Sequence, residues 1–225
     1  MKYFNNAASH LCVLAAPATA IALLFSVAAF PVVADSSKAL ALETHAGFFS
    51  TEVKLEQALD PQVFVKAPSA ESATGPQGIK HVAGFRNALV ADDATLPIFT
   101  ADGKPMDMTL GQWLSAQGDV VLTPMAGGAQ RVKVALSGLK PNGHYSFFKN
   151  HFDQKPIGFT PLDGLGTDNS FIASAAGRGV VSIMSPSPLT HDNAVLLVYH
   201  SDGKTYGKSR GEIGLNAHHQ LIVRP

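Results

Sequence analysis

The chain has 225 residues, 17 basic and 17 acidic side chains, an isoelectric point near 7.1 and 46% apolar residues. This composition is typical of a folded protein with a hydrophobic core and excludes a disordered tail. The balanced charge also argues against a protein drawn onto nucleic acid by its overall field. The length allows one large domain, or one ordinary domain preceded by an N-terminal extension.

Residues 1–34 have the features of an export signal. Lys2 is the only charged residue among them, and the stretch from Leu11 to Phe30 is almost continuously apolar. Ala34 offers the small residue that signal peptidase requires, and a polar stretch follows it. We therefore expect a periplasmic or secreted protein, cleaved after Ala34 and without a membrane span. The alternative is an uncleaved anchor, because about 20 apolar residues can cross a bilayer.

The only cysteine, Cys12, lies inside this signal segment. After cleavage the protein would have no disulfide and no thiolate for catalysis or metal binding. The sequence of the mature protein therefore excludes type 1 copper sites, thiolate zinc sites and cysteine hydrolases. Eight of the nine histidines follow residue 34 and remain as candidate ligands.

Residues 35–94 are expected to form a helical or irregular N-terminal extension and a linker. A mild helical pattern begins this segment and would end at Pro61. Residues 66–78 are rich in Pro, Gly and small side chains, as linkers are. A single folded domain is then expected over residues 95–225.

A second helix is predicted at the start of this domain. Thr109 and Gln112 have the spacing of a capping box, in which each side chain accepts from the backbone N–H of the other residue. The apolar positions that follow share one helical face, and Gly118 would end the helix. The helix is expected to bury Trp113, the only tryptophan.

From residue 119 onward, short runs rich in Val, Ile, Phe and Tyr alternate with Gly, Pro, Asn and Asp, which predicts strands and turns. Seven such runs indicate an all-β fold, an antiparallel immunoglobulin-like β-sandwich. The runs are Asp119–Met125, Gln130–Leu139, His144–Phe152, Ser170–Ala175, Gly179–Ser185, Ala194–Ser201 and His218–Arg224.

Two of these runs predict how the strands are buried. Val132, Val134 and Leu136 recur with a period of two, so they should face the core while the cations between them face water. The run 194–199 is apolar on both faces. A strand of that kind should be central, with one face on the opposite sheet and the other under a helix or a long loop.

A short segment has the spacing of a tyrosine corner. Leu139, Pro141 and Tyr145 follow the pattern Leu-x-Pro-x-x-x-Tyr, in which the tyrosine hydroxyl bonds to the backbone a few residues upstream. The segment resembles the corner of fibronectin type III and related immunoglobulin-like sandwiches. More loosely, the layout of residues 113–225 resembles secreted bacterial proteins of unassigned function. Both resemblances imply a fold and no particular chemistry.

The principal functional hypothesis is an exported, non-catalytic module that binds a small molecule or associates with the cell envelope, without a cofactor. Sandwich proteins commonly bind through loops, and the basic loop 204–212 could form one end of such a surface. An enzyme whose site converges from several loops is the third alternative. The chain after residue 34 has no His-Glu-x-x-His motif and no phosphate-binding glycine motif.

The second hypothesis is a periplasmic protein that binds copper or another metal through His and Met. No His-x-His pair is present, and the adjacent His218 and His219 would point to opposite faces of a strand. The ligands would have to converge from different strands and loops. For each of them the simpler interpretation is a hydrogen-bonded histidine or a methionine that fills the core. The candidate ligands are His144, His200, His218, His219, Met106 and Met108.

Overall fold

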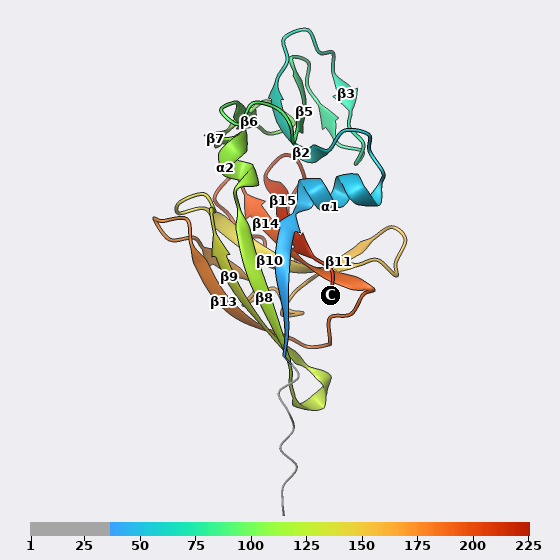
Figure 1. The fold of residues 1–225 in the computed structure, drawn as a ribbon, viewed down its shortest axis with the longest axis vertical. Coiled ribbons are helices and arrows are strands. Elements are labelled where there is room, and N and C mark those ends of the chain that lie inside the picture. The colour runs from blue at the N-terminus through green and yellow to red at the C-terminus, as the bar shows by residue number, and fades with distance from the viewer. Residues whose placement is uncertain (1–36) are drawn as a thin grey trace, which may run out of the picture. The chain divides into compact units, whose positions relative to one another are not determined.

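A computed structural model of the protein describes residues 37–225, which consist mostly of antiparallel β-strands (Figure 1). The predicted export signal and its cleavage site lie outside the described residues. Neither α-helix in the described range is long and apolar enough to cross a membrane.

The largest sheet has the strand order β11-β10-β14-β15-β1-β8-β9-β13, with β12 also paired to β10. Each of the seven runs predicted as strands is a strand of this sheet, with ends that differ by a few residues. The sequence prediction of an all-β fold is therefore confirmed. The strands are β1 (Lys38–Thr44), β8 (Gln117–Pro124), β9 (Gln130–Ser137), β10 (His144–His151), β11 (Gly158–Pro161), β12 (Ser170–Ile172), β13 (Gly179–Ser185), β14 (Asn193–His200) and β15 (Ala217–Val223).

Strand β1 joins the two halves of this sheet. Residues 38–42 pair with β8, whereas Glu43 and Thr44 pair with β15. The sheet therefore curls around one core, to which both halves contribute. Val132, Val134 and Leu136 of β9 all lie in that core, as their alternation predicted.

Strand β14 is central and buried on both faces, as expected from its sequence. Val195, Leu197 and Tyr199 face the main core. The opposite face belongs to a second apolar cluster, which Phe48 of helix α1 (His45–Glu52) and Ile213 of the loop before β15 help to cover.

The prediction for residues 35–94 needs correction. Residues 38–44 form strand β1 instead of a helix, because both of its edges find partner strands. Helix α1 follows at once, and its N-cap is Thr44, whose Oγ1 accepts from Gly47 N–H at 3.2 Å. The chain then enters β2 (Leu59–Lys66), so Pro61 lies within a buried strand and does not end a helix.

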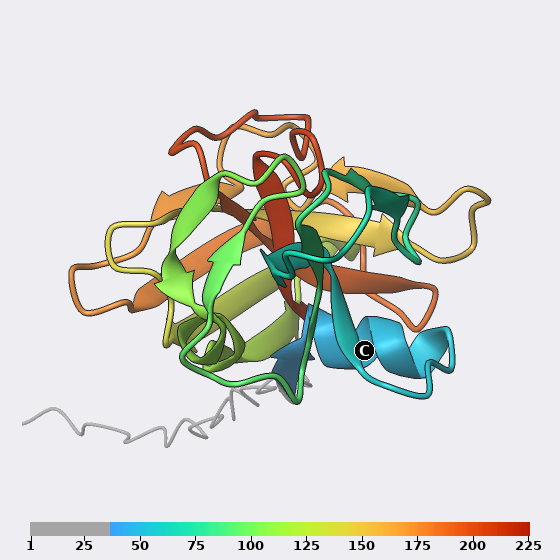
Figure 2. The ribbon, with the colours of Figure 1, turned by 90° about the horizontal axis from the view of Figure 1, so that it is seen from above.

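The segment predicted as a linker belongs to the folded structure. Strand β2 lies in a four-stranded sheet of order β5-β2-β6-β7, and β3 pairs with β4. Figures 1 and 2 show this smaller sheet at one end of the main sheet, and the described residues 37–225 belong to one compact unit. The remaining strands are β3 (Ala73–Thr74), β4 (Lys80–His81), β5 (Phe85–Leu89), β6 (Pro97–Phe99) and β7 (Pro105–Thr109).

Helix α2 (Leu110–Leu114) has the predicted capping box. Gln112 N–H donates to Thr109 Oγ1 at 3.2 Å, and Thr109 N–H donates to Gln112 Oε1 at 2.8 Å. Trp113 is buried at 2% exposure. The helix is shorter than predicted, because Gly118 belongs to β8, where a Cβ would stand 2.6 Å from the carbonyl oxygen of Ala135.

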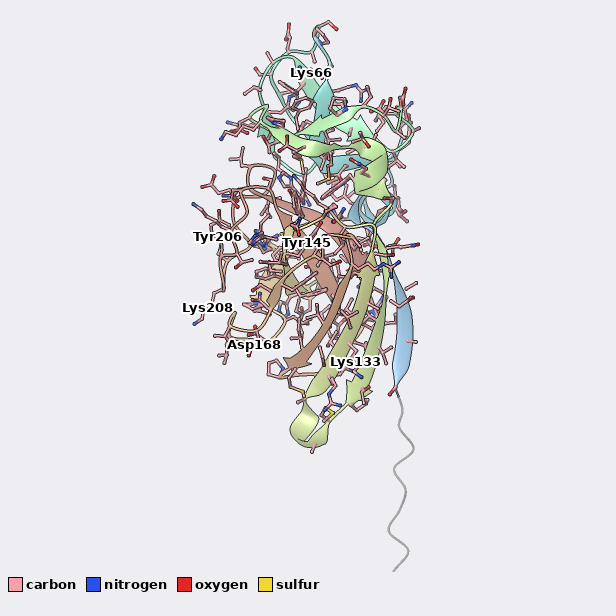
Figure 3. The ribbon with its side chains drawn as sticks, turned by 90° about the vertical axis from the view of Figure 1, so that its left-hand side faces the viewer. Lys66, Lys133, Tyr145, Asp168, Tyr206 and Lys208 are labelled. Atoms are coloured by element: carbon pink, nitrogen blue, oxygen red, sulfur yellow. The ribbon has the colours of Figure 1, made fainter. Side chains whose placement is uncertain are left out.

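The hydrogen bond predicted for Tyr145 is present. The backbone N–H of Lys140 donates to the Tyr145 hydroxyl oxygen at 2.9 Å, and the ring is fully buried. Asn142, in the turn between them, has a φ of 57°, a conformation that asparagine tolerates better than most residues. Figure 3 shows Tyr145 among the strands of the main sheet.

Candidate functional site

Strand β2 carries two buried polar side chains at the junction of the two sheets. Asp60 Oδ2 accepts from Trp113 Nε1–H at 2.8 Å, and its Oδ1 accepts from Gln62 N–H at 2.8 Å. Burial disfavours the carboxylate form more than these bonds favour it, which raises the pKa of Asp60 to about 6.

Gln62 fixes two adjacent histidines of β15. Its side-chain Oε1 accepts from the backbone N–H of His219 at 2.6 Å, and its backbone oxygen lies 3.1 Å from His218 Nδ1. The other ring nitrogen of His218 lies 3.2 Å from Ser201 Oγ. Because His218 is completely buried, desolvation lowers its pKa to about 4, and the imidazole is neutral at pH 7.

His219 points to the other face of β15, where it forms a chain of contacts with Arg210 and His45. Arg210 Nη1 lies 3.0 Å from His219 Nε2, and His219 Nδ1 lies 3.3 Å from His45 Nε2. Both imidazoles are buried, so desolvation lowers the pKa of His45 to about 3 and that of His219 well below its usual value. The pair is therefore neutral at pH 7.

The strand pairing explains why His45 and His219 meet. Thr44, the last residue of β1, is paired with Leu221 of β15. His45 is the first residue of α1, so it leaves the sheet beside β15 and reaches His219. Their rings pack edge to face with centroids 4.8 Å apart.

These two histidines line a cavity of about 430 Å³ beneath α1, called here the α1 cavity. Its walls are mainly aromatic and aliphatic, and they come from α1, β11, β15, the C-terminal end of β10 and the turn between β3 and β4. The lining residues are His45, Phe48, Phe49, Glu52, Val53, Pro76, Gln77, Asn150, Phe152, Ile157, Phe159, His219 and Ile222.

Two polar atoms of this lining lack partners. His45 Nδ1 and Asn150 Oδ1 are buried and form no hydrogen bond to any described residue. A buried polar group without a partner costs on the order of 1–3 kcal/mol, so such atoms are exceptions in folded proteins. Two of them beside one cavity are consistent with a site that is completed by another molecule.

Arg210 brings a positive charge to the edge of the α1 cavity. Its guanidinium carbon lies 3.1 Å from the centroid of the Phe159 ring. Burial lowers the pKa of Arg210 to about 10, which leaves it protonated at neutral pH. No carboxylate within residues 37–225 lies within 4 Å of its guanidinium, whereas Glu52 at the cavity has Arg224 as its partner at 3.8 Å.

Arg210 belongs to the basic loop that the sequence predicted as a binding surface. Within this loop, Tyr206 donates a hydrogen bond to Asp202 and accepts one from Asn216 Nδ2 at 3.0 Å. Figure 3 shows Tyr206 and Lys208 at the side of the molecule. In contrast, Arg210 contacts the buried His219. This contact connects the basic loop with the lining of the α1 cavity.

The six predicted metal ligands are not gathered at one point. Met106 and Met108 lie on β7 and pack into the main core, not on a loop. His144 and His200 face each other across β10 and β14. The imidazoles of His218 and His219 have different partners and lie on opposite faces of β15, as their adjacency predicted. Within residues 37–225 no group of three or more His, Cys, Asp or Glu is placed to hold a metal ion.

His200 also has a serine neighbour. Its Nε2 lies 2.6 Å from Ser146 Oγ, an arrangement that hydrolases use for a nucleophile and its base. Here both side chains are buried, at 1% and 2% exposure, and His200 Nδ1 has no orienting partner among the described residues. Neither residue lines the α1 cavity, so the contact is read as a hydrogen bond within the fold.

Sequence reasoning missed the central contacts of the α1 cavity. His45 was one of eight candidate histidines, but no local spacing connects it with His219, which lies 174 positions away. Arg210 was noted only as part of a basic loop, and Asn150 gave no signal. Comparison with protein-family models, with curated proteins and with solved structures yields no match, so the functional hypothesis depends on contacts within the chain itself.

Proposed function

We propose that this protein is an exported, non-catalytic binding module on an immunoglobulin-like β-sandwich, and that its ligand is a small apolar or aromatic molecule held in the α1 cavity. The observation that carries the proposal is the cavity of about 430 Å³ with two buried polar atoms left without partners, His45 Nδ1 and Asn150 Oδ1. Ligand sites typically combine a mainly apolar cavity of this size with a few polar groups that orient the ligand.

The walls of the α1 cavity suit an aromatic or aliphatic guest. Phe48, Phe49, Phe152 and Phe159 all line it, and Phe48 and Phe152 already pack against each other with centroids 5.9 Å apart. Aromatic side chains bury large apolar areas and favour stacked or edge-to-face contacts with further rings. A ligand of this class would gain most of its binding free energy by removing apolar surface from water.

The chemistry of the lining favours binding over catalysis. A general base works best when its pKa lies near the working pH. The pKa of His45 is lowered to about 3 by burial, so its imidazole is a weak base at pH 7. Burial also lowers the pKa of His219. Both are better suited to hydrogen bonding with a bound molecule than to proton transfer.

Export and the immunoglobulin-like topology complete the proposal. The apolar segment before Ala34 supports export. N-terminal sequencing of protein from its native host should then begin at Asp35, and an intact Met1 on membrane-embedded protein would contradict this.

The curled antiparallel sheet and the hydrogen bond between Lys140 and Tyr145 support the immunoglobulin-like assignment.

A neutral fluorescent probe tests binding in the α1 cavity. We expect N-phenyl-1-naphthylamine to bind saturably with enhanced fluorescence. Ile157 lines the cavity and is 46% exposed, so Ile157→Ala should leave the fold intact and weaken binding about fivefold through lost apolar contact. Ile172 is 60% exposed and lies outside the cavity lining, so Ile172→Ala is the matched control. No saturable binding, or equal losses in both variants, would refute the proposal.

A further inference from the structure

We infer that the ligand of the α1 cavity carries an acidic oxygen, as a carboxylate does, and that this oxygen accepts a hydrogen bond from the Nδ1–H of His45. The inference rests on the proposed function, because it names the chemical class of the molecule that the cavity binds. It follows from the direction of the hydrogen bonds that connect Arg210, His219 and His45.

The positions of the protons in this series of hydrogen bonds are fixed by Arg210. A guanidinium group can only donate hydrogen bonds, so His219 Nε2 must be the acceptor in the 3.0 Å contact with Arg210. A neutral imidazole carries its single proton on the other nitrogen, so His219 Nδ1 is a donor. His45 Nε2, at 3.3 Å, therefore accepts.

The same logic places the last proton of the chain. Because His45 Nε2 accepts, the proton of this neutral imidazole is on Nδ1. That N–H group is buried and has no partner in the described part of the chain, and His45 lines the α1 cavity. The series of hydrogen bonds that begins at the Arg210 guanidinium thus ends at His45 Nδ1–H, which lacks an acceptor.

The charges around the α1 cavity favour an anionic acceptor over a neutral one. Arg210 is partly buried, packs on Phe159 and has no ion-pair partner in residues 37–225. Glu52, the acidic residue of the lining, is 50% exposed in its side chain and is offset by Arg224. A hydrogen bond to an ionised acceptor is also about twice as strong as one to a neutral acceptor.

Paired competitors that differ in charge test the inference. Octanoate and octanol have similar apolar chains, and each can be titrated against bound N-phenyl-1-naphthylamine at pH 7.5. We expect octanoate to displace the probe at a concentration about tenfold lower than octanol requires. Displacement by octanol alone would overturn the inference and leave the proposed function standing. Failure of the probe itself to bind would refute the proposed function instead.

An arginine variant then locates the charge effect. Arg210→Met removes the cation and the first donor of the chain while it keeps a long apolar side chain on Phe159. It should abolish the preference for octanoate with little effect on octanol. Arg178 is exposed and outside the cavity lining, so Arg178→Met should keep the preference. An unchanged preference in Arg210→Met would overturn the inference.

The proton positions can also be measured in the unmodified protein, which keeps the inference testable if Arg210→Met does not fold. Long-range ¹H–¹⁵N correlation spectra distinguish the two tautomers of a neutral imidazole. We expect both His45 and His219 to carry their protons on Nδ1 at pH 7.5. A His45 ring protonated on Nε2 would exclude the donor that the inference requires.

Discussion

Acidification should destabilise this protein strongly, because the folded protein buries several neutral histidines. Burial lowers the pKa of His45 to about 3 and those of His200 and His218 to about 4, whereas each would titrate near 6.5 in the unfolded chain. At pH values between the folded and the unfolded pKa, the unfolded chain therefore binds more protons than the folded protein. The stability that these groups contribute is complete above pH 6.5 and is lost as the pH falls toward 4.

The magnitude follows from the pKa differences. Between pH 7 and pH 5 each of the three histidines lowers the free energy of unfolding by about 2 kcal/mol, or about 5 to 6 kcal/mol together. The pKa of Asp60 is raised to about 6 by burial, so protonation of its carboxyl in the folded state returns about 1 kcal/mol over the same range. The net loss is about 4 kcal/mol, and His219 adds to it because its pKa is also lowered. Domains are commonly stable by about 5–15 kcal/mol, so the loss is a large fraction of the total.

Urea denaturation monitored by fluorescence measures this effect, because the chain has one tryptophan and Trp113 is buried. The denaturation midpoint should fall steadily from pH 7 to pH 5. His200→Gln should reduce the pH dependence by about 2 kcal/mol over that range. The exposed His191 offers a control, since His191→Gln should leave the dependence unchanged. A free energy of unfolding that is constant or rises between pH 7 and pH 5 would show that the buried histidines are not neutral.

Three further predictions concern single sites. Tyr145→Phe should lower the free energy of unfolding by about 1 kcal/mol without changing ligand binding, because it removes the bond from Lys140 N–H; equal urea midpoints would contradict this. Gly177→Ala should be much more destabilising than Gly203→Ala. Both glycines have positive φ, but only at Gly177 would a Cβ meet backbone, 2.3 Å from the carbonyl oxygen of Leu139, and similar thermal midpoints would count against the packing. Equimolar Cu(II), Cu(I) or Zn(II) should not shift the unfolding temperature, whereas a shift of several degrees that His200→Ala abolishes would favour the metal-binding hypothesis.

The sequence alone predicted the strands after residue 119 because their signals are local. In β9, alternation with a period of two places Val132, Val134 and Leu136 on the buried face, whatever sheet the strand joins. The capping box of Thr109 and Gln112 is equally local, since all its atoms lie within four residues. Such patterns depend on the chain's own geometry, so they can be recognised without knowledge of the fold.

The N-terminal half was misjudged because its strands depend on distant partners. Strand β2 contains Asp60, Pro61 and Gln62, all buried, and shows no alternation of apolar and polar residues. A buried strand of this composition is stable only because Trp113 and the β15 histidines complete its polar groups. Those partners lie at least 50 residues away in the chain, so a local pattern could not have revealed them.

The sequence by itself determined the all-β class, the helix cap at residue 109 and the opposite orientations of His218 and His219, because each follows from backbone geometry over a few residues. Only the tertiary structure decided where the candidate site lies. The register between Thr44 and Leu221 places His45 against His219, and the loop between β14 and β15 places Arg210 on the far side of that pair. These contacts join residues up to 174 positions apart, and they form because the sheet curls around its core and closes β1 against β15.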